Sequence, residues 1–135
     1  MKLPKFVSLK EKMRTYYTLF LFLFLGVACS EAQNTENYSL VSTQEFSKMV
    51  EDESIQLIDV RTPGEYGGGT IAHAENIDYL GGNFEAKVKE LNLEQPIYLF
   101  CQSGGRSKKA SDQLLKLGAK EVIELDGGYG AWQSR

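Results

Sequence analysis

One cysteine, at the end of an apolar run, is the residue of this 135-residue chain best placed for chemistry. Cys101 follows the apolar stretch 96–100, and a helical pattern begins a few residues later. The backbone N–H groups of such a turn can face the sulfur, and the start of a helix adds positive potential that favours an anion. The segment 101–107 is therefore a candidate site for an anionic sulfur. The alternative is an ordinary turn from a strand to a helix, whose cysteine is merely a small buried apolar residue.

We expect Cys101 to be the reactive residue and the six residues after it to surround its substrate. These six are short, flexible or polar: Gln102, Ser103, Gly104, Gly105, Arg106 and Ser107. A free cysteine ionises at about pH 8.5, so a thiolate at neutral pH needs backbone N–H groups, a helix N-terminus or nearby cations. Arg106 is the nearest candidate cation. Lys108 and Lys109 lie in the first turn of the predicted helix, where they either attract an anionic substrate or are simply solvated.

Short strands and helices alternate along the chain and predict the frame that holds this segment. Strands are expected at 38–41, 55–60, 76–77, 96–100 and 122–125. Helices are expected from the capping box of Ser42 and Glu45 to residue 50, from that of Thr62 and Glu65 to residue 66, over 84–91, and after the cysteine segment until Gly118. This alternation predicts an α/β domain with a small, mostly parallel central sheet and helices on both faces. Such sheets bind ligands at the carboxyl ends of their strands, where Cys101 lies.

The first 28 residues are expected to be an export signal rather than part of the fold. An apolar run over 16–28 follows five basic residues, Lys2, Lys5, Lys10, Lys12 and Arg14. The run has thirteen residues, whereas a membrane-spanning helix needs about 20. It is therefore typical of a secretory signal peptide.

A cysteine directly after the expected cleavage site indicates how the exported chain is attached to a membrane. The segment Gly26-Val27-Ala28-Cys29 resembles the lipobox of bacterial lipoproteins, although it has Gly26 where that pattern prefers leucine. The resemblance implies that Cys29 carries lipid as the first residue of the mature protein; the alternative is cleavage at the same bond without lipid. We expect an exported protein of the periplasm or cell envelope, with residues 29–37 as a polar tether, 38–135 as the folded domain, and membrane contact only through the anchor.

Charge and cysteine content narrow the partners of the mature chain. Residues 29–135 carry ten basic and seventeen acidic side chains, which give a formal net charge of −7. This negative charge argues against nucleic acid as a binding partner. If Cys29 is lipidated, Cys101 has no partner for an intramolecular disulfide, and a lone thiol outside the cytoplasm calls for a chemical role. If Cys29 is free, a Cys29–Cys101 disulfide is the alternative.

Four separated motifs resemble those of the rhodanese family, in order, over residues 38–135. They are Asp59-Val60-Arg61-Thr62-Pro63-Gly64-Glu65-Tyr66, Gly69-Thr70-Ile71-Ala72-His73-Ala74-Glu75-Asn76-Ile77, the segment 101–107, and Leu125-Asp126-Gly127-Gly128-Tyr129-Gly130-Ala131-Trp132. The chain departs from the family in one place, since it has Thr70 where the family usually has histidine and His73 where it usually has glycine. The only histidine, His73, is expected to be a loop residue rather than a catalytic base or metal ligand.

The resemblance implies a sulfurtransferase of the thiosulfate sulfurtransferase type. The six residues from Cys101 to Arg106 match its active-site loop, whereas related phosphatases use seven. The thiolate would take the outer sulfur of a small anion such as thiosulfate, hold it as a persulfide, and pass it to cyanide or to a thiol, for example that of a thioredoxin-like protein. No metal or organic cofactor is implied. A non-enzymatic module that carries sulfur or binds a protein is an alternative, and a phosphatase or oxyanion reductase is disfavoured by the short loop.

The remaining motif residues have structural interpretations. We expect Asp59 and Arg61 to hold the strand-end loop near the site through an ion pair. Gly127 and Gly128 are expected to supply turn conformations that other residues avoid. Trp132 is expected in the core.

Overall fold

The computed structural model describes residues 37–135. The elements in chain order are β1 (Tyr38–Val41), α2 (Thr43–Met49), β2 (Gln56–Asp59), α3 (Pro63–Gly67), β3 (Glu75–Asn76), α4 (Phe84–Val88), β4 (Ile97–Phe100), α5 (Gly105–Lys116), β5 (Val122–Leu125) and α6 (Gly128–Gln133). The predicted leader, Cys29 and the tether as far as residue 36 lie outside the described residues. Within residues 37–135, no helix has the length and apolar character needed to cross a membrane.

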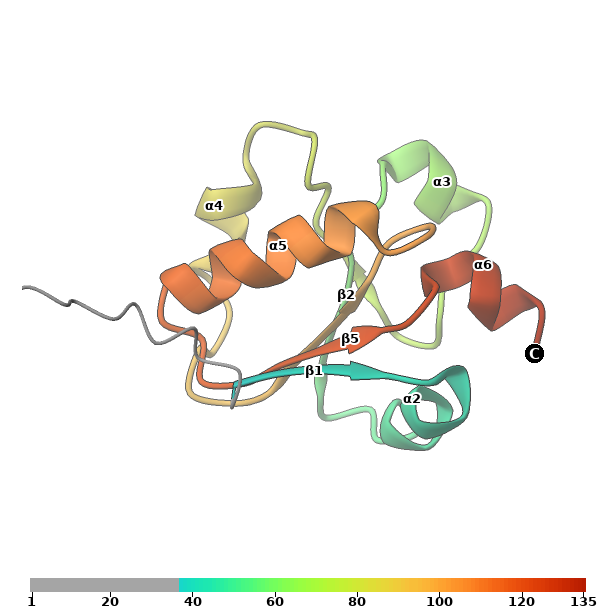
Figure 1. The fold of residues 1–135 in the computed structure, drawn as a ribbon. Helices are drawn as coiled ribbons and strands as arrows, with labels where there is room; N and C mark the ends of the chain where they lie inside the picture. Colours follow the sequence, from blue (N-terminus) through green and yellow to red (C-terminus); the bar gives the residue numbers. More distant parts are fainter. Residues whose placement is uncertain (1–36) are drawn as a thin grey trace, which may run out of the picture. The chain divides into compact units, whose positions relative to one another are not determined.

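The five strands form one sheet in the order β1-β5-β4-β2-β3, and every neighbouring pair is parallel (Figure 1). The predicted α/β fold is therefore confirmed, with a sheet that is parallel throughout. Because all strands run the same way, the residues that follow β2, β4 and β5 meet at one edge of the sheet.

Two apolar clusters cover the two faces of the sheet. On one face, α4 and α5 pack Val88, Ala110 and Leu114 against Ile97 and Leu99. On the other, residues of α2 and α6 pack against the opposite sides of the same strands, namely Phe46 and Val50 with Trp132, Phe100, Ile123 and Leu125. Figure 1 shows α5 lying across one face and α2 on the opposite one. Alternating residues of β4 thus feed different clusters, as period-two side chains require.

Local sequence signals place the helix ends. Ser42 and Glu45 form the predicted capping box at the start of α2, and Thr62 and Glu65 form the one at the start of α3. Gly118, just past the end of α5, has a φ of 102°, the left-handed conformation expected at a helix end.

Besides one-residue differences at the ends of α2, β2, α3 and β4, the structure differs from the sequence-based expectation in four local details. β3 covers Glu75–Asn76, one residue earlier than expected, because Glu75 and Asn76 pair with Ile58 and Asp59. α4 ends at Val88, and Leu91 packs on the core from beyond the helix. α6 was not predicted, because its glycines favour a turn. Trp132, expected in the core, is only half-buried at its margin.

Candidate active site

The sulfur of Cys101 lies at the end of β4, directly before the N-terminus of α5. The residue is buried, with 1% of its surface exposed. The N–H of Gly104 points at Sγ at 3.1 Å, and the hydroxyl oxygen of Ser107 lies 3.3 Å from it. Gly104 can turn its amide inward because its φ is 98°. The predicted arrangement of N–H groups around a sulfur at a helix start is therefore present.

Opposing effects set the ionisation of this thiol. Burial raises the pKa of Cys101, but the hydroxyl of Ser107 and the N–H groups of Ser107, Ser103 and Gly104 together lower it further than burial raises it. The net result is a pKa below the ordinary value of a cysteine. The hydrogen-bond donors of the loop thus favour the thiolate.

The C-terminal helix fixes the carbonyl side of the loop. The N–H of Tyr129 donates to the carbonyl of Cys101 at 2.7 Å, and the N–H of Gly130 donates to that of Gln102 at 3.0 Å. Gly128, with a φ of 60°, allows this approach, because a Cβ there would overlap the Cys101 carbonyl and lie 2.9 Å from the backbone of Gln102. The turn glycines Gly127 and Gly128 both have positive φ, as predicted. The loop is consequently held from outside by backbone groups of α6.

Arg106 forms a two-point ion pair with Glu65. Both guanidinium nitrogens donate to the carboxylate at 2.7 Å, while the same carboxylate closes the capping box of α3. The hydrogen bond from Arg106 is the main cause that holds the pKa of Glu65 at about 2. The pair ties the first turn of α5 to α3. Arg106 itself makes no hydrogen bond to the sulfur in the described part of the chain.

A second, buried ion pair supports the loop from below. Arg61, 2% exposed, donates to Asp59 at 2.6 Å, to the carbonyl of Gly69 at 2.6 Å and to the side chain of Gln102 at 3.3 Å. Its guanidinium also stacks 3.9 Å from the centre of the Tyr129 ring. The ion pair predicted between Asp59 and Arg61 is thus present, and it contacts the loop through Gln102.

Thr70 occupies the position at which the chain departs from the rhodanese pattern. Its hydroxyl donates to Asp59 at 2.9 Å, so the carboxylate of the buried pair keeps a donor there. Thr70 thus adds a donor to those that hold the buried carboxylate of Asp59.

The other predicted substrate-binding residues differ in exposure. Ser103 and Gly105 are exposed at the mouth of the loop, Gln102 and Gly104 are half-buried, and Ser107 is fully buried behind the sulfur. Their contact with a substrate stays a prediction.

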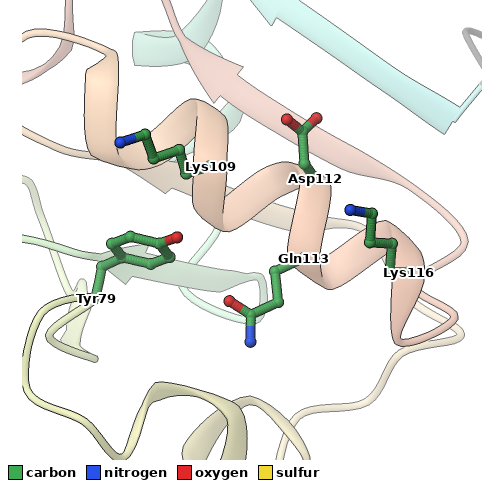
Figure 2. Close-up of a pocket in the computed structure, with 5 residues that line it drawn as sticks. All are labelled: Tyr79, Lys109, Asp112, Gln113 and Lys116. Carbon is green, nitrogen blue, oxygen red and sulfur yellow. The ribbon is translucent and has the colours of Figure 1, made fainter.

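Among residues 37–135, neither lysine after the loop donates a hydrogen bond to the sulfur. Lys108 pairs with Asp112 at 2.6 Å and lies over the ring of Tyr38. Lys109 lines a hollow with Asp112, Gln113 and Lys116 of α5, across from Tyr79 (Figure 2). Steering of an anion by these lysines stays a prediction.

His73 lies apart from the cysteine. It is exposed in the loop between α3 and β3, beside the acidic residues Glu51 and Glu53 and near Trp132. The structure thus places it in a loop, as predicted.

Three residues near the cysteine were not predicted to take part. The sequence assigns Glu65 to a helix cap, Tyr129 to a motif and Glu124 to the last strand, and it indicates no contact between them and the cysteine segment. Glu124 is buried and bonds to Ser107 behind the sulfur. An acidic residue within the otherwise apolar stretch 122–125 was the signal that could have identified it.

Comparison with known proteins agrees with this geometry. The sequence model of the rhodanese-like domain family matches residues 42–135 of this chain. Two relatives come from Bacillus subtilis. YqhL is 40% identical over 77 residues, which are 57% of this chain and 60% of YqhL. YrkF, named as a putative sulfur carrier protein, is 32% identical over 105 residues, which are 77% of this chain and 56% of YrkF. The chain thus spans less than two thirds of these two relatives.

Shorter relatives are covered almost completely. The thiosulfate sulfurtransferase GlpE of Shewanella oneidensis is 27% identical over 96 residues, covering 71% of this chain and 93% of GlpE. The crystal structure of a rhodanese-related protein from Thermoplasma volcanium superimposes with a TM-score of 0.63 and 26% identity, over 72% of this chain and 92% of that one. With the cysteine loop, its helix and the matched residues in agreement, the chain belongs to the family of rhodanese-like domains.

Proposed function

We propose that this protein is a sulfurtransferase that carries sulfane sulfur as a persulfide on Cys101. The thiolate attacks the outer sulfur of a donor such as thiosulfate, a new S–S bond forms at Sγ, and the S–S bond of the donor breaks. Sulfite leaves with the electron pair of that bond. An acceptor thiolate or cyanide then attacks the outer sulfur of the persulfide, and Cys101 leaves as a thiolate.

The observation that carries this proposal is the placement of a single thiol under backbone donors at a helix N-terminus. A thiolate is both the nucleophile of the first step and the leaving group of the second, so a lowered pKa serves both steps. The N–H of Gly104, 3.1 Å from Sγ, is positioned to stabilise negative charge on the sulfur at either stage. The identity of GlpE to this chain, at 27%, supports the same chemistry.

Intact-mass measurement of the full-length protein after incubation with thiosulfate tests this function. We expect a gain of one sulfur atom, which is absent in Cys101→Ser and reversed by cyanide with formation of thiocyanate. The Cys101→Ser control also separates Cys101 from Cys29, the other cysteine of the chain. If thiosulfate and organic persulfides both leave the mass unchanged, the proposal is wrong.

A sulfur carrier is a second candidate, because YrkF, at 32% identity, is named as one. A carrier loads one sulfur atom but does not turn over, whereas an enzyme releases many equivalents of thiocyanate per cysteine. Counting thiocyanate against protein under excess thiosulfate and cyanide distinguishes the two.

We propose further that the protein is exported, anchored through lipid on Cys29 and unloaded by a thiol partner such as a thioredoxin-like protein. Support comes from the basic and apolar leader and from the Gly26-Val27-Ala28-Cys29 sequence. Labelled fatty acid should enter the protein in a bacterial host and fail to enter Cys29→Ala. Unlabelled wild-type protein would refute the anchor.

A further inference from the structure

Behind the active-site cysteine lies a buried acid that the proposed chemistry does not use. Glu124, in the middle of β5, is 1% exposed and faces α5. Its carboxylate contacts three hydroxyl groups: Ser107 lies 2.5 Å from Oε1, while Tyr38 and Ser111 lie 2.8 and 3.1 Å from Oε2. An acid at a position otherwise used for apolar packing calls for an explanation.

The groups around Glu124 provide hydrogen bonds but no counter-charge. Among residues 37–135, no basic side chain pairs with it. On the β1 side, Lys108 is engaged by Asp112 and the Tyr38 ring, and Asp126 adds further negative charge near that phenol. Burial and the bond to Glu124 raise the pKa of Tyr38, so this phenol stays a donor.

On the cysteine side, the nearby charges are likewise occupied. Arg106 is bound to Glu65, and the charges of Cys101 and Asp78 also act on it. Within residues 37–135, the carboxylate of Glu124 and the sulfur of Cys101 are therefore two acids joined through one hydroxyl. Neither has a cation hydrogen-bonded to it in that part of the chain.

The hydroxyl of Ser107 has one proton and three acceptors in reach. They are Oε1 of Glu124 at 2.5 Å, the carbonyl of Gly104 at 3.2 Å and Sγ of Cys101 at 3.3 Å. A hydroxyl donates only one hydrogen bond, and a short bond to a carboxylate is the strongest of the three. An ionised Glu124 competes with the sulfur for this single proton, so the hydroxyl stabilises the thiolate less than it does beside a neutral Glu124. When Glu124 is protonated, it donates to Ser107, and the hydroxyl can then donate to the thiolate.

We propose that Glu124 is a positioning residue that controls the ionisation of Cys101 through the hydroxyl of Ser107, its carboxylate disfavouring the thiolate and its protonation favouring it. Repulsion between the two negative charges acts in the same direction. This interaction couples the ionisation of Cys101 to the negative charge on Glu124. Its importance for turnover rests on the proposed function, but the coupling is measured without any sulfur donor.

Thiolate absorbance near 240 nm, recorded against pH on the full-length protein, tests this coupling. Subtracting the curve of Cys101→Ser removes the contributions of Cys29 and the tyrosines. We expect Glu124→Gln to lower the midpoint by about one pH unit, which is a tenfold larger thiolate fraction on the acidic side. Glu121→Gln, the same change at an exposed position three residues earlier, should leave the midpoint unchanged.

A double-mutant cycle separates the hydroxyl from simple charge repulsion. In a Ser107→Ala background, the shift caused by Glu124→Gln should fall to less than half. A midpoint unchanged by Glu124→Gln, or an equal shift in the two backgrounds, would overturn the proposal.

A second readout needs no change at Glu124. The ¹³C signal of the Glu124 carboxyl in the otherwise unchanged protein should shift over the same pH range in which Cys101 ionises, and this step should be absent in Cys101→Ser. A carboxyl signal that stays flat through the ionisation of Cys101 also contradicts the coupling. If no persulfide forms yet these shifts are seen, the sulfur-transfer function fails and the coupling stands.

Discussion

Gly128→Ala isolates the contact that holds the cysteine loop in place. A Cβ at this position would overlap the carbonyl oxygen of Cys101 and lie 2.9 Å from atoms of Gln102 and Ser103. Since these are backbone atoms, the loop or α6 has to move. The movement would break the bonds at 2.7 and 3.0 Å that α6 donates to the loop carbonyls.

The expected cost of Gly128→Ala has two parts. A φ of 60° in a residue with a Cβ costs roughly 1–2 kcal/mol. Loss of the two hydrogen bonds adds about 0.5–1.5 kcal/mol each. We therefore expect the free energy of unfolding to fall by about 2–5 kcal/mol. Displacement of the loop by a fraction of an ångström to 1 Å should also slow persulfide formation by up to about 100-fold.

Gly118→Ala is the matched control. Gly118 has a φ of 102°, but a Cβ there meets nothing within 4 Å, so the variant carries the backbone cost alone. Urea unfolding followed by the fluorescence of Trp132, the single tryptophan, measures both variants. Persulfide formation should be normal in Gly118→Ala. Equal losses of stability in the two variants, with unimpaired sulfur uptake in Gly128→Ala, would refute the role given to this close approach.

Three further changes test the surroundings of the cysteine. Because the pKa of Glu65 is about 2 in the folded chain against an ordinary 4.5, its pairing with Arg106 stabilises the fold fully above pH 4.5 and is lost as the pH falls toward 2. Over this pH range the free energy of unfolding of the wild-type protein should fall by about 1–2 kcal/mol more than that of Glu65→Gln, a value reduced because the pair is partly exposed. Parallel acid unfolding curves of the two proteins would contradict the pairing. Thr70→Val removes a donor to a buried carboxylate and should cost about 1 kcal/mol in urea unfolding; an unchanged midpoint would mean that this bond contributes nothing. Changing Lys108 and Lys109 together to Glu should raise the apparent Michaelis constant for thiosulfate at low salt only, whereas identical kinetics at all salt concentrations would exclude steering.

The fold and the position of the nucleophile could be predicted because their signals are local. Apolar runs predict the strands, two capping boxes begin α2 and α3, and the family motifs predict the cysteine segment. Such features depend on neighbours a few residues apart. For most of the predicted strands and helices, the ends in the structure lie within one residue of the expected ends.

The missing parts depend on residues that meet only after folding. Tyr38 and Glu124 are 86 residues apart in sequence, yet they bond across the edge of the sheet. α6 contains two glycines in six residues and has little tendency to be helical by itself, so its contacts with the loop carbonyls stabilise it. Arg106 carries the charge expected beside the thiol, but its partner Glu65 comes from a different helix.

The dependence of the loop on α6 also orders events in time. The last helical segment supplies the amides that hold the carbonyls of Cys101 and Gln102. During synthesis, β4 and its cysteine emerge before α6, so the thiol exists for an interval without its final environment. A chain truncated after β5 would retain Cys101 and all five strands, but it would lack the N–H groups of α6 that hold the loop carbonyls. If the proposed function holds, persulfide formation on Cys101 therefore requires α6 to be folded against the loop.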